Sequence, residues 1–253
     1  MEKPKAAARP IDLRVGCAGW SIARAQQPRF DEGASMLARY ATRFNAMEIN
    51  SSFHRPHRRA TYERWASAVP AHFRFAVKLP KTISHTARLR KTSALLDVFL
   101  AQAQGLGDKL GCLLLQLPPS LAFDARIATT FFGVLRRRYS GEVACEPRHA
   151  SWFSANLDAL WQRYALAHVV ADPAPTAADH PPGSTAPLRY WRLHGSPRTY
   201  YSSYNDAALR ALVAEVSAGT PAGARAWVMF DNTAHGHAIT DALRFQTLMA
   251  EKI

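Results

Sequence analysis

Eight short apolar segments recur along this chain, and most of them are followed by a stretch with the spacing of an amphipathic helix. The apolar segments lie at residues 13–17, 46–50, 73–79, 112–117, 142–146, 167–171, 189–194 and 226–231. The stretch 173–187, after the sixth segment, is rich in Pro, Ala and Gly and has no helical period, which predicts a long loop. This regular alternation predicts a parallel sheet covered by helices.

The number of units selects the architecture. Eight strand–helix units in 253 residues match a TIM-type (β/α)8 barrel, which typically takes about 250 residues, here with one helix replaced by the loop after the sixth strand. An open doubly wound α/β sheet is the main alternative, but the turn at 16–20 lacks the third glycine and the acidic residue of a dinucleotide site. Composition marks no domain boundary, so residues 13–253 are expected to form a single domain after a flexible basic tail over 1–12.

Composition also excludes several classes of protein. Hydrophobic residues make up 48% of the chain, which argues against disorder. No apolar run reaches the roughly 18–20 residues that cross a bilayer, and no apolar segment of a signal peptide follows the basic N-terminus, so a cytoplasmic protein without membrane association is expected. Cys17, Cys112 and Cys145 lie far apart among small or apolar residues, which predicts reduced thiols in the core.

The chain is strongly basic, with 32 Lys and Arg residues against 19 Asp and Glu residues and a formal net charge of +13. Such an excess attracts phosphates, nucleic acid or acidic metabolites. A composition in which Arg outnumbers Lys explains the excess equally well. The charge therefore leaves a small anionic or phosphorylated ligand, a nucleic acid and no specific partner as alternatives, and the oligomeric state stays unknown.

Alternate residues of a barrel strand point toward the barrel axis and toward the helices. In six of the segments one parity is consistently apolar and the other carries polar residues, which predicts that the second parity faces the axis. For 167–171 and 226–231 this assignment places Val170 and Val228 on the inner side. The inner charges come last in their strands, where barrel enzymes hold their active sites.

The predicted inner set supplies a candidate site. Its catalytic candidates are Glu48, Lys78, Glu146, Asp172 and His194. Its candidate substrate-binding residues are Asn50, Gln116, Arg192 and Asn232, joined by Trp20, His85 and Arg148 from the loops. The structural alternative is a polar plug of salt bridges, such as Glu48 with Lys78 and Glu146 with Arg192.

The residue types suggest roles within this site. Glu48 and Glu146 are acid/base candidates, and His194 is a candidate proton shuttle. The cations that suit an anion clamp are Lys78, Arg148 and Arg192. Two basic loops, which follow the second and third strands, lie on the same predicted face, and loop aromatics such as Phe53 and Tyr200 could stack on a ligand or cap the barrel.

Metal binding is an alternative use of the same side chains. The hard ligands available for Mg²⁺ or Mn²⁺ are Glu48, Glu146, Asp172 and His194. No local spacing motif supports a metal site, so no metal ligand and no cofactor are assigned, and a divalent metal stays an open alternative.

Several motifs together resemble those of a known family. They are GCAGWS at 16–21, FNAMEINSSF at 44–53, FRFAVKLPKTISH at 73–85, LLQLP at 114–118, EPRHASW at 146–152, YWRLHG at 190–195 and FDNT at 230–233. In this order they are similar to the motifs of the YecE-like family, also called domain of unknown function 72. The resemblance implies a TIM-type barrel without an established activity. The residues that it marks as typical of the family are Glu48, Asn50, Lys78, His85, Glu146, Arg148, Asp172, Arg192, His194 and Asn232.

The chain departs from the family pattern at three places. The loop at 22–31 is short and lacks a common aromatic element, His54 stands where a Tyr is usual, and Asp231 stands where an Asn is usual. Part of the wall of the site is therefore expected to differ.

These observations lead to one expected function and two alternatives. The expected function is that of an enzyme of the hydrolase or isomerase class, acting on a phosphorylated or other anionic substrate at the C-terminal face of the barrel. The first alternative is a non-catalytic protein that binds nucleic acid or an acidic partner. The second is a hydrolase or isomerase that depends on a divalent metal.

Overall fold

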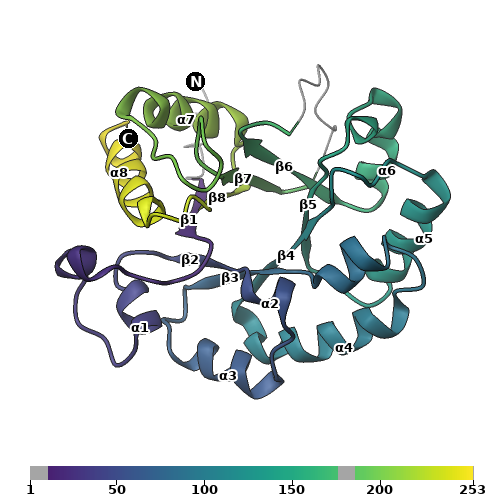
Figure 1. Ribbon diagram of the computed structural model, residues 1–253, viewed down its shortest axis with the longest axis horizontal. Coiled ribbons are helices and arrows are strands. Elements are labelled where there is room, and N and C mark those ends of the chain that lie inside the picture. The colour runs from purple at the N-terminus through teal and green to yellow at the C-terminus, as the bar shows by residue number, and fades with distance from the viewer. Residues whose placement is uncertain (1–10, 176–185, 253) are drawn as a thin grey trace, which may run out of the picture.

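The computed structural model describes residues 11–175 and 186–252, which form a barrel of eight parallel strands surrounded by helices (Figure 1). The strands are β1 (Asp12–Cys17), β2 (Ala46–Ile49), β3 (Arg74–Lys78), β4 (Leu110–Gln116), β5 (Glu142–Glu146), β6 (Leu166–Asp172), β7 (Leu188–Leu193) and β8 (Arg225–Phe230). From β2 to β8, neighbours in the chain pair with one another in the sheet, and β8 pairs with β1. The predicted TIM-type barrel is confirmed.

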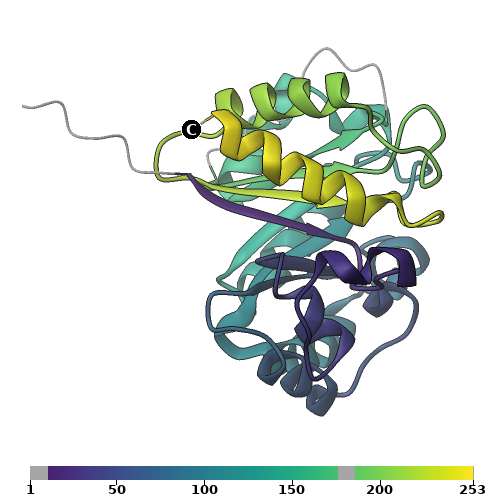
Figure 2. The ribbon, with the colours of Figure 1, turned by 90° about the vertical axis from the view of Figure 1, so that its left-hand side faces the viewer.

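The helices follow the strands as the periodicity predicts, with one addition. They are α1 (Met36–Tyr40), α2 (Ser51–His54), α3 (Arg59–Ser67), α4 (Ser93–Ala103), α5 (Ala125–Arg136), α6 (Asp158–Arg163), α7 (Asp206–Gly219) and α8 (His237–Lys252). The single turn α2 has no amphipathic period long enough to predict it. The last helix, α8, lies beside the first strand, β1, so the two ends of the barrel meet there (Figure 2).

Side chains close the barrel between β1 and β2. The Tyr40 hydroxyl accepts from the backbone N–H of Cys17 at 2.7 Å and donates to the carbonyl of Ala46 at 3.1 Å, so it replaces a direct bond between the two strands. The strands lie so close that a Cβ on Gly16 would lie 2.0 Å from the Ala46 carbonyl oxygen. A glycine is needed at this position because any side chain would push the seam apart.

The interior of the barrel is filled by small residues on one side and large ones on the other. Alanines face the axis from β2, β3 and β5, whereas Tyr190 and Trp227 stack across the opposite side with ring centres 6.0 Å apart. The outer faces of the strands pack against the helices in a separate, larger core. The predicted parity is confirmed for β2, β3, β5 and β7, whose inner residues continue into Glu48, Lys78, Glu146 and Arg192.

The predicted parity is wrong for β6 and β8. In β8, Trp227 and Met229 lie inside and Val228 lies in the helix-facing core, so Asp231 continues the inner row and Asn232 does not. In β6, Val169 lies inside, which places Asp172 on the outer parity. From Ala226 to Phe230, β8 is apolar on both faces, so its alternation carries no signal. In β6 the polar residues His168 and Asp172 share the outer parity, so polarity does not mark the inner face there.

Some predictions fall on residues that are not described. Residues 1–10 of the predicted tail 1–12 lie outside the described part, and β1 already begins at Asp12. Most of the loop predicted over 173–187 also lies outside it. The three cysteines are buried and free, as predicted. Among the helices of the described part, none is both long and apolar enough to span a membrane.

Part of the positive charge has a structural role at the N-terminal end of the barrel. Arg136 donates to the backbone carbonyls of Tyr164 at 2.7 Å and Gly141 at 2.6 Å, and so ties together two loops that lead into strands. The other cations that donate to such carbonyls are Arg14, Arg74, Lys109 and Arg189. These groups satisfy backbone oxygens that would otherwise lack partners.

Candidate active site at the C-terminal end of the barrel

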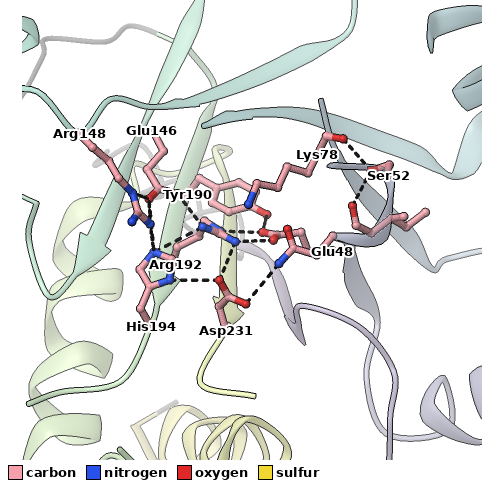
Figure 3. Close-up of polar contacts among 11 residues, drawn as sticks. Glu48, Ser52, Lys78, Glu146, Arg148, Tyr190, Arg192, His194 and Asp231 are labelled. Atoms are coloured by element: carbon pink, nitrogen blue, oxygen red, sulfur yellow. Dashed lines mark hydrogen bonds and ion pairs between the residues drawn. The ribbon is translucent and has the colours of Figure 1, made fainter. Parts of the chain in front are cut away.

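Arg192 lies at the centre of a cluster of charged side chains at the C-terminal ends of the strands (Figure 3). Its guanidinium contacts both oxygens of Glu48, with Nε–Oε2 of 2.9 Å and Nη2–Oε1 of 2.6 Å. It also donates to Glu146 at 2.7 Å and to Asp231 at 2.8 Å. The remaining N–H faces His194 Nε2 at 3.4 Å. Four of the five N–H groups are therefore engaged by carboxylates, which leaves Arg192 little capacity to bind a ligand.

Two of the three carboxylates around Arg192, those of Glu146 and Asp231, are held in their charged form. Burial disfavours the charge of Glu146, but Arg192, His194 and Arg148 hold its pKa well below the usual range. The pKa of Asp231 is lowered in the same way, because Arg192 and His194 outweigh the effect of burial. Glu48 accepts a further hydrogen bond from the Tyr190 hydroxyl at 2.9 Å. These contacts favour ionised carboxylates with fixed positions.

His194 joins this cluster to the edge of the mouth. Its Nδ1 lies 3.1 Å from Asp231 Oδ2, and its Nε2 lies 3.4 Å from Glu146 Oε1. Burial alone would lower its pKa, but the hydrogen bonds to these two carboxylates raise the pKa above 6.5. Tyr200, from the loop after β7, places its ring edge to face with the imidazole at 5.5 Å. His194 is thus a proton-carrying group close to neutral pH.

Lys78 differs from the other charges because its ammonium has no carboxylate partner. The residue is only 6% exposed, and within the described part of the chain no acidic oxygen lies within 4.0 Å of Nζ. In Figure 3 its only dashed line runs from the backbone carbonyl to Ser52. The ammonium lies 4.3 Å from the centre of the Phe53 ring. Burial and then the charge of Arg192 lower the pKa of Lys78 to about 8.

Two further groups lie on the same side of the mouth as Lys78. Arg148 contacts Glu146 through Nε at 2.8 Å and Nη2 at 2.6 Å, whereas its Nη1 has no hydrogen bond within the described residues. His85 lies against Phe53 with ring centres 4.9 Å apart. Burial lowers the pKa of His85, and the charges of Lys78 and Arg148 lower it further.

Two amide side chains face the mouth with unused acceptors. Asn50 donates weakly to Asp231 Oδ1 at 3.4 Å, and its own buried Oδ1 has no partner. Gln116 is the last residue of β4, on the parity that faces the axis, and it is in register with Glu146. Its Oε1 is likewise buried without a partner. Such oxygens are uncommon, because a buried acceptor without a donor costs about 1–3 kcal/mol.

The structure does not bring two of the predicted residues into the cluster. Asn232 donates to Asp241 on α8 at 2.6 Å and to the carbonyl of Ser202 at 3.0 Å, so it anchors the last helix. Asp172 contributes its backbone carbonyl to the Tyr204 hydroxyl at 3.2 Å, on the outer side of the barrel. Both placements follow from the reversed parity of β6 and β8.

Trp20 lies apart from the charged cluster. Its ring packs edge to face against Trp65 at 5.2 Å. It lines a separate groove of about 320 Å³, together with Thr233 and Gly236 near the start of α8. The substrate-binding role of Trp20 stays a prediction.

Two members of the cluster were not among the predicted site residues. Asp231 follows a strand that is apolar from Ala226 to Phe230, and only correct parity could have selected it over Asn232. Tyr190 lies one layer deeper, where its hydroxyl contacts Glu48. The sequence could have indicated Tyr190, because alternate residues of a strand face the same side and Tyr190 alternates with Arg192 and His194.

The cluster combines a paired half and an unpaired half. The predicted ion pair between Glu146 and Arg192 is present. The predicted pair between Glu48 and Lys78 is not, because Arg192 reaches across from β7 to Glu48. Within the described residues, no three His, Cys, Asp or Glu side chains converge as a metal site would require. The carboxylates that hard metals prefer are directed at Arg192 instead.

Comparison with known proteins gives relatives without a described activity. The model of the family described as "Protein of unknown function DUF72" matches residues 14–253. The "UPF0759 protein YecE" of Escherichia coli K12 is 36% identical over 86 residues, which span 34% of this chain and 32% of that protein. The matched stretch is thus about a third of the curated relative.

Solved structures of similar proteins share the fold. A DUF72 family protein from Enterococcus faecalis V583 superposes with a TM-score of 0.78 at 21% identity, covering 96% of this chain and 99% of that one. A DUF72 family protein from Thermotoga maritima gives a TM-score of 0.78 at 22% identity, with 94% and 99% covered. The family match over almost the entire sequence shows that this chain belongs to DUF72, a family of proteins of unknown function.

Proposed function

We propose that this protein is an enzyme of the hydrolase or isomerase class, which binds a phosphorylated or other anionic substrate at the C-terminal end of the barrel. The observation that carries this proposal is the unpaired ammonium of Lys78, which is 6% exposed and has no acidic partner in the described chain. Leaving a charge buried and unpaired is costly. An anion bound at the mouth would supply the missing partner.

The neighbours of Lys78 support an anion at this place. The free Nη1 of Arg148 and the imidazole of His85 add donors on the same side, and Phe53 forms an apolar wall beside them. A cation in a partly dry pocket attracts an anion more strongly than one in water does. Arg192, by contrast, is not part of the anion clamp in this proposal, because four of its five N–H groups are engaged by protein carboxylates and the fifth faces His194.

His194 is the proposed proton-transfer group. Asp231 fixes its Nδ1, and its Nε2 faces the side of the mouth where Arg148 lies. A pKa raised above 6.5 keeps a proton available near neutral pH, where general acid–base catalysis is most efficient. Glu48 and Glu146 serve in this proposal as fixed charges that orient Arg192 and stabilise protonated His194, rather than as acid/base groups.

Anion binding is tested with inorganic phosphate and isothermal titration calorimetry. The variant Lys78→Met removes the ammonium and keeps the length of the side chain, and Lys81→Met at an exposed position is the matched control. Lys78→Met is expected to weaken phosphate binding at least about tenfold, which is the effect of a charge-assisted hydrogen bond. Wild-type protein that binds no phosphate, or equal binding by Lys78→Met, would refute the proposal.

A further inference from the structure

The side chains that have an atom without a hydrogen-bond partner at the mouth come from consecutive strands. Asn50 follows β2, Lys78 ends β3, Gln116 ends β4, and Arg148 follows β5. On the other side of the mouth, Arg192, His194 and Asp231 bond to one another and to the carboxylates. The unfilled hydrogen-bonding capacity is therefore concentrated in one arc, from β2 to β5.

This arc contains two kinds of unfilled atom. Lys78 Nζ and Arg148 Nη1 are donors and require an acceptor. Asn50 Oδ1 and Gln116 Oε1 are buried acceptors and require a donor. A ligand that satisfies all four atoms must carry an anionic group and, beside it, groups that donate hydrogen bonds.

The orientation of Asn50 is fixed by its neighbour. Its Nδ2 faces Asp231 Oδ1 at 3.4 Å, and the pKa of Asp231 is held low, so this carboxylate can only accept. Turning the amide over would bring two acceptor oxygens together. The Oδ1 of Asn50 therefore lacks a partner in the one orientation of the amide that suits Asp231.

The position of Gln116 points to the same ligand group. It lies between the strand that carries Lys78 and the strand that carries Glu146, on the parity that faces the axis. Neither a carboxylate nor a phosphate oxygen can satisfy its buried Oε1, because both are acceptors at neutral pH. An ammonium could donate, but Lys78, Arg148 and Arg192 would repel it. A hydroxyl group donates without adding positive charge.

We propose that the substrate is a polyhydroxylated anion of the class of sugar phosphates and sugar acids, with its anionic group against Lys78 and its hydroxyl groups on Asn50 and Gln116. This inference rests on the proposed anion-binding function and makes it more specific. Selection would follow because hydroxyl groups supply the donors that Asn50 and Gln116 lack, whereas a ligand without hydroxyl groups leaves both oxygens unpaired.

Matched ligand pairs test the inference by isothermal titration calorimetry. Glycerol 3-phosphate and propyl phosphate share the anionic group and the chain length, but only the first has hydroxyl groups. Gluconate and hexanoate form the equivalent pair with a carboxylate. At least one hydroxylated ligand is expected to bind about tenfold or more tightly than its partner. The pair that shows the difference identifies the anionic group as phosphate or carboxylate.

Variants then assign the effect to a residue. Gln116→Met keeps the length of the side chain and removes no hydrogen bond of the described protein, so the fold should persist. The Gln116→Met variant is expected to bind the hydroxylated ligand more weakly, with an affinity close to that of the ligand without hydroxyl groups. Its affinity for the ligand without hydroxyl groups should stay unchanged. Gln162→Met, at an exposed position on α6, is the control and should change neither.

The outcomes separate this inference from the proposal beneath it. Equal affinities within both pairs, together with weaker binding by Lys78→Met, would overturn the hydroxyl inference and leave the anion site standing. An unchanged preference in Gln116→Met and in Asn50→Leu would likewise overturn it. Absence of binding by all four ligands, or binding that Lys78→Met does not weaken, would overturn the proposed function itself.

Discussion

Arg192 holds both carboxylate oxygens of Glu48 across the mouth of the barrel, at 2.9 and 2.6 Å, and both side chains are fully buried. The two residues come from β7 and β2, so this contact joins two strands on opposite sides of the seam. The contact also occupies Glu48, the carboxylate that could have paired with Lys78. Lys78 is consequently left without a carboxylate, and the mouth acquires a paired half and an unpaired half.

The central role of Arg192 predicts a large loss of stability when it is removed. Arg192→Met leaves Glu48, Glu146 and Asp231 buried without their common partner. The free energy of unfolding in urea is expected to fall by about 3–5 kcal/mol, the usual result of breaking a buried ion pair from one side. Arg138→Met, which removes an exposed pair with Asp97, should cost much less, because solvent screens an exposed pair. Equal losses in the two variants would show that the buried cluster is not a stabilising unit.

The raised pKa of His194 predicts how stability depends on pH. Because the folded pKa lies above the unfolded value of 6.5, protonation of His194 stabilises the fold at pH values below 6.5, and this contribution is lost as the pH rises through the folded pKa. The wild type should therefore lose more stability than His194→Asn as the pH rises from 6.5 through the folded pKa. Urea unfolding at a series of pH values measures this difference, and parallel curves for the two proteins would contradict it.

The lowered pKa of Lys78 predicts the opposite slope at higher pH. A lysine whose pKa is about 8 when folded and 10.5 when unfolded binds fewer protons in the fold, so its contribution to stability rises between these values. Lys78→Met should abolish this rise and should be more stable than the wild type at neutral pH, since it removes an unpaired buried charge. Unfolding curves from about pH 7 to pH 10 test the prediction. A less stable Lys78→Met protein would mean that the ammonium has a stabilising partner.

The seam between β1 and β2 predicts a role for a single hydroxyl group. Tyr40→Phe leaves the N–H of Cys17 and the carbonyl of Ala46 unpaired in the core. A loss of about 1–3 kcal/mol is expected, the cost of leaving such groups buried without partners. Tyr201→Phe, at a residue 38% exposed, should be close to neutral. Hydrogen exchange at the Cys17 amide should accelerate only in the first variant, and an unchanged rate there would argue that another contact closes the barrel.

Much of the fold could be predicted because the strands of a closed barrel repeat one pattern. The inner row could be identified in β2, β5 and β7, where a charged residue breaks an apolar alternation at Glu48, Glu146 and Arg192. It could not be identified in β8, where Trp227 fills the barrel and both faces are apolar. Asp231 and Asn232 are adjacent polar residues there, and the choice between them depends on a register that the sequence leaves open.

The pairing within the site could be predicted only in part. The alternative of a salt-bridged plug paired Glu48 with Lys78 and Glu146 with Arg192, and only the second pair is present. The guanidinium of Arg192 crosses the barrel because its long side chain satisfies three carboxylates at once with a planar set of donors. A pairing of this kind depends on reach and geometry across the mouth, which strand order alone does not specify.

The net charge of +13 has more than one structural origin. Arg136 and Lys109 are occupied by backbone carbonyls at the N-terminal end of the barrel, so they contribute to the fold. Lys78 and Arg148 belong to the opposite end, where they lie close to unused acceptors. This division favours a defined ligand site over a broad surface for nucleic acid, whose binding would draw on many exposed cations at once.

The titration of the Lys78 ammonium, followed by NMR of carbon-13 labelled lysine, tests the account most directly. Lys78→Arg assigns its signal, and the titration is repeated in inorganic phosphate. The account predicts a midpoint of about 8 in the free protein, which rises when phosphate binds because an adjacent anion favours the charged form. A midpoint near the ordinary lysine value in the free protein, or one that phosphate does not move, would contradict the claim that Lys78 is an unpaired cation awaiting an anionic substrate.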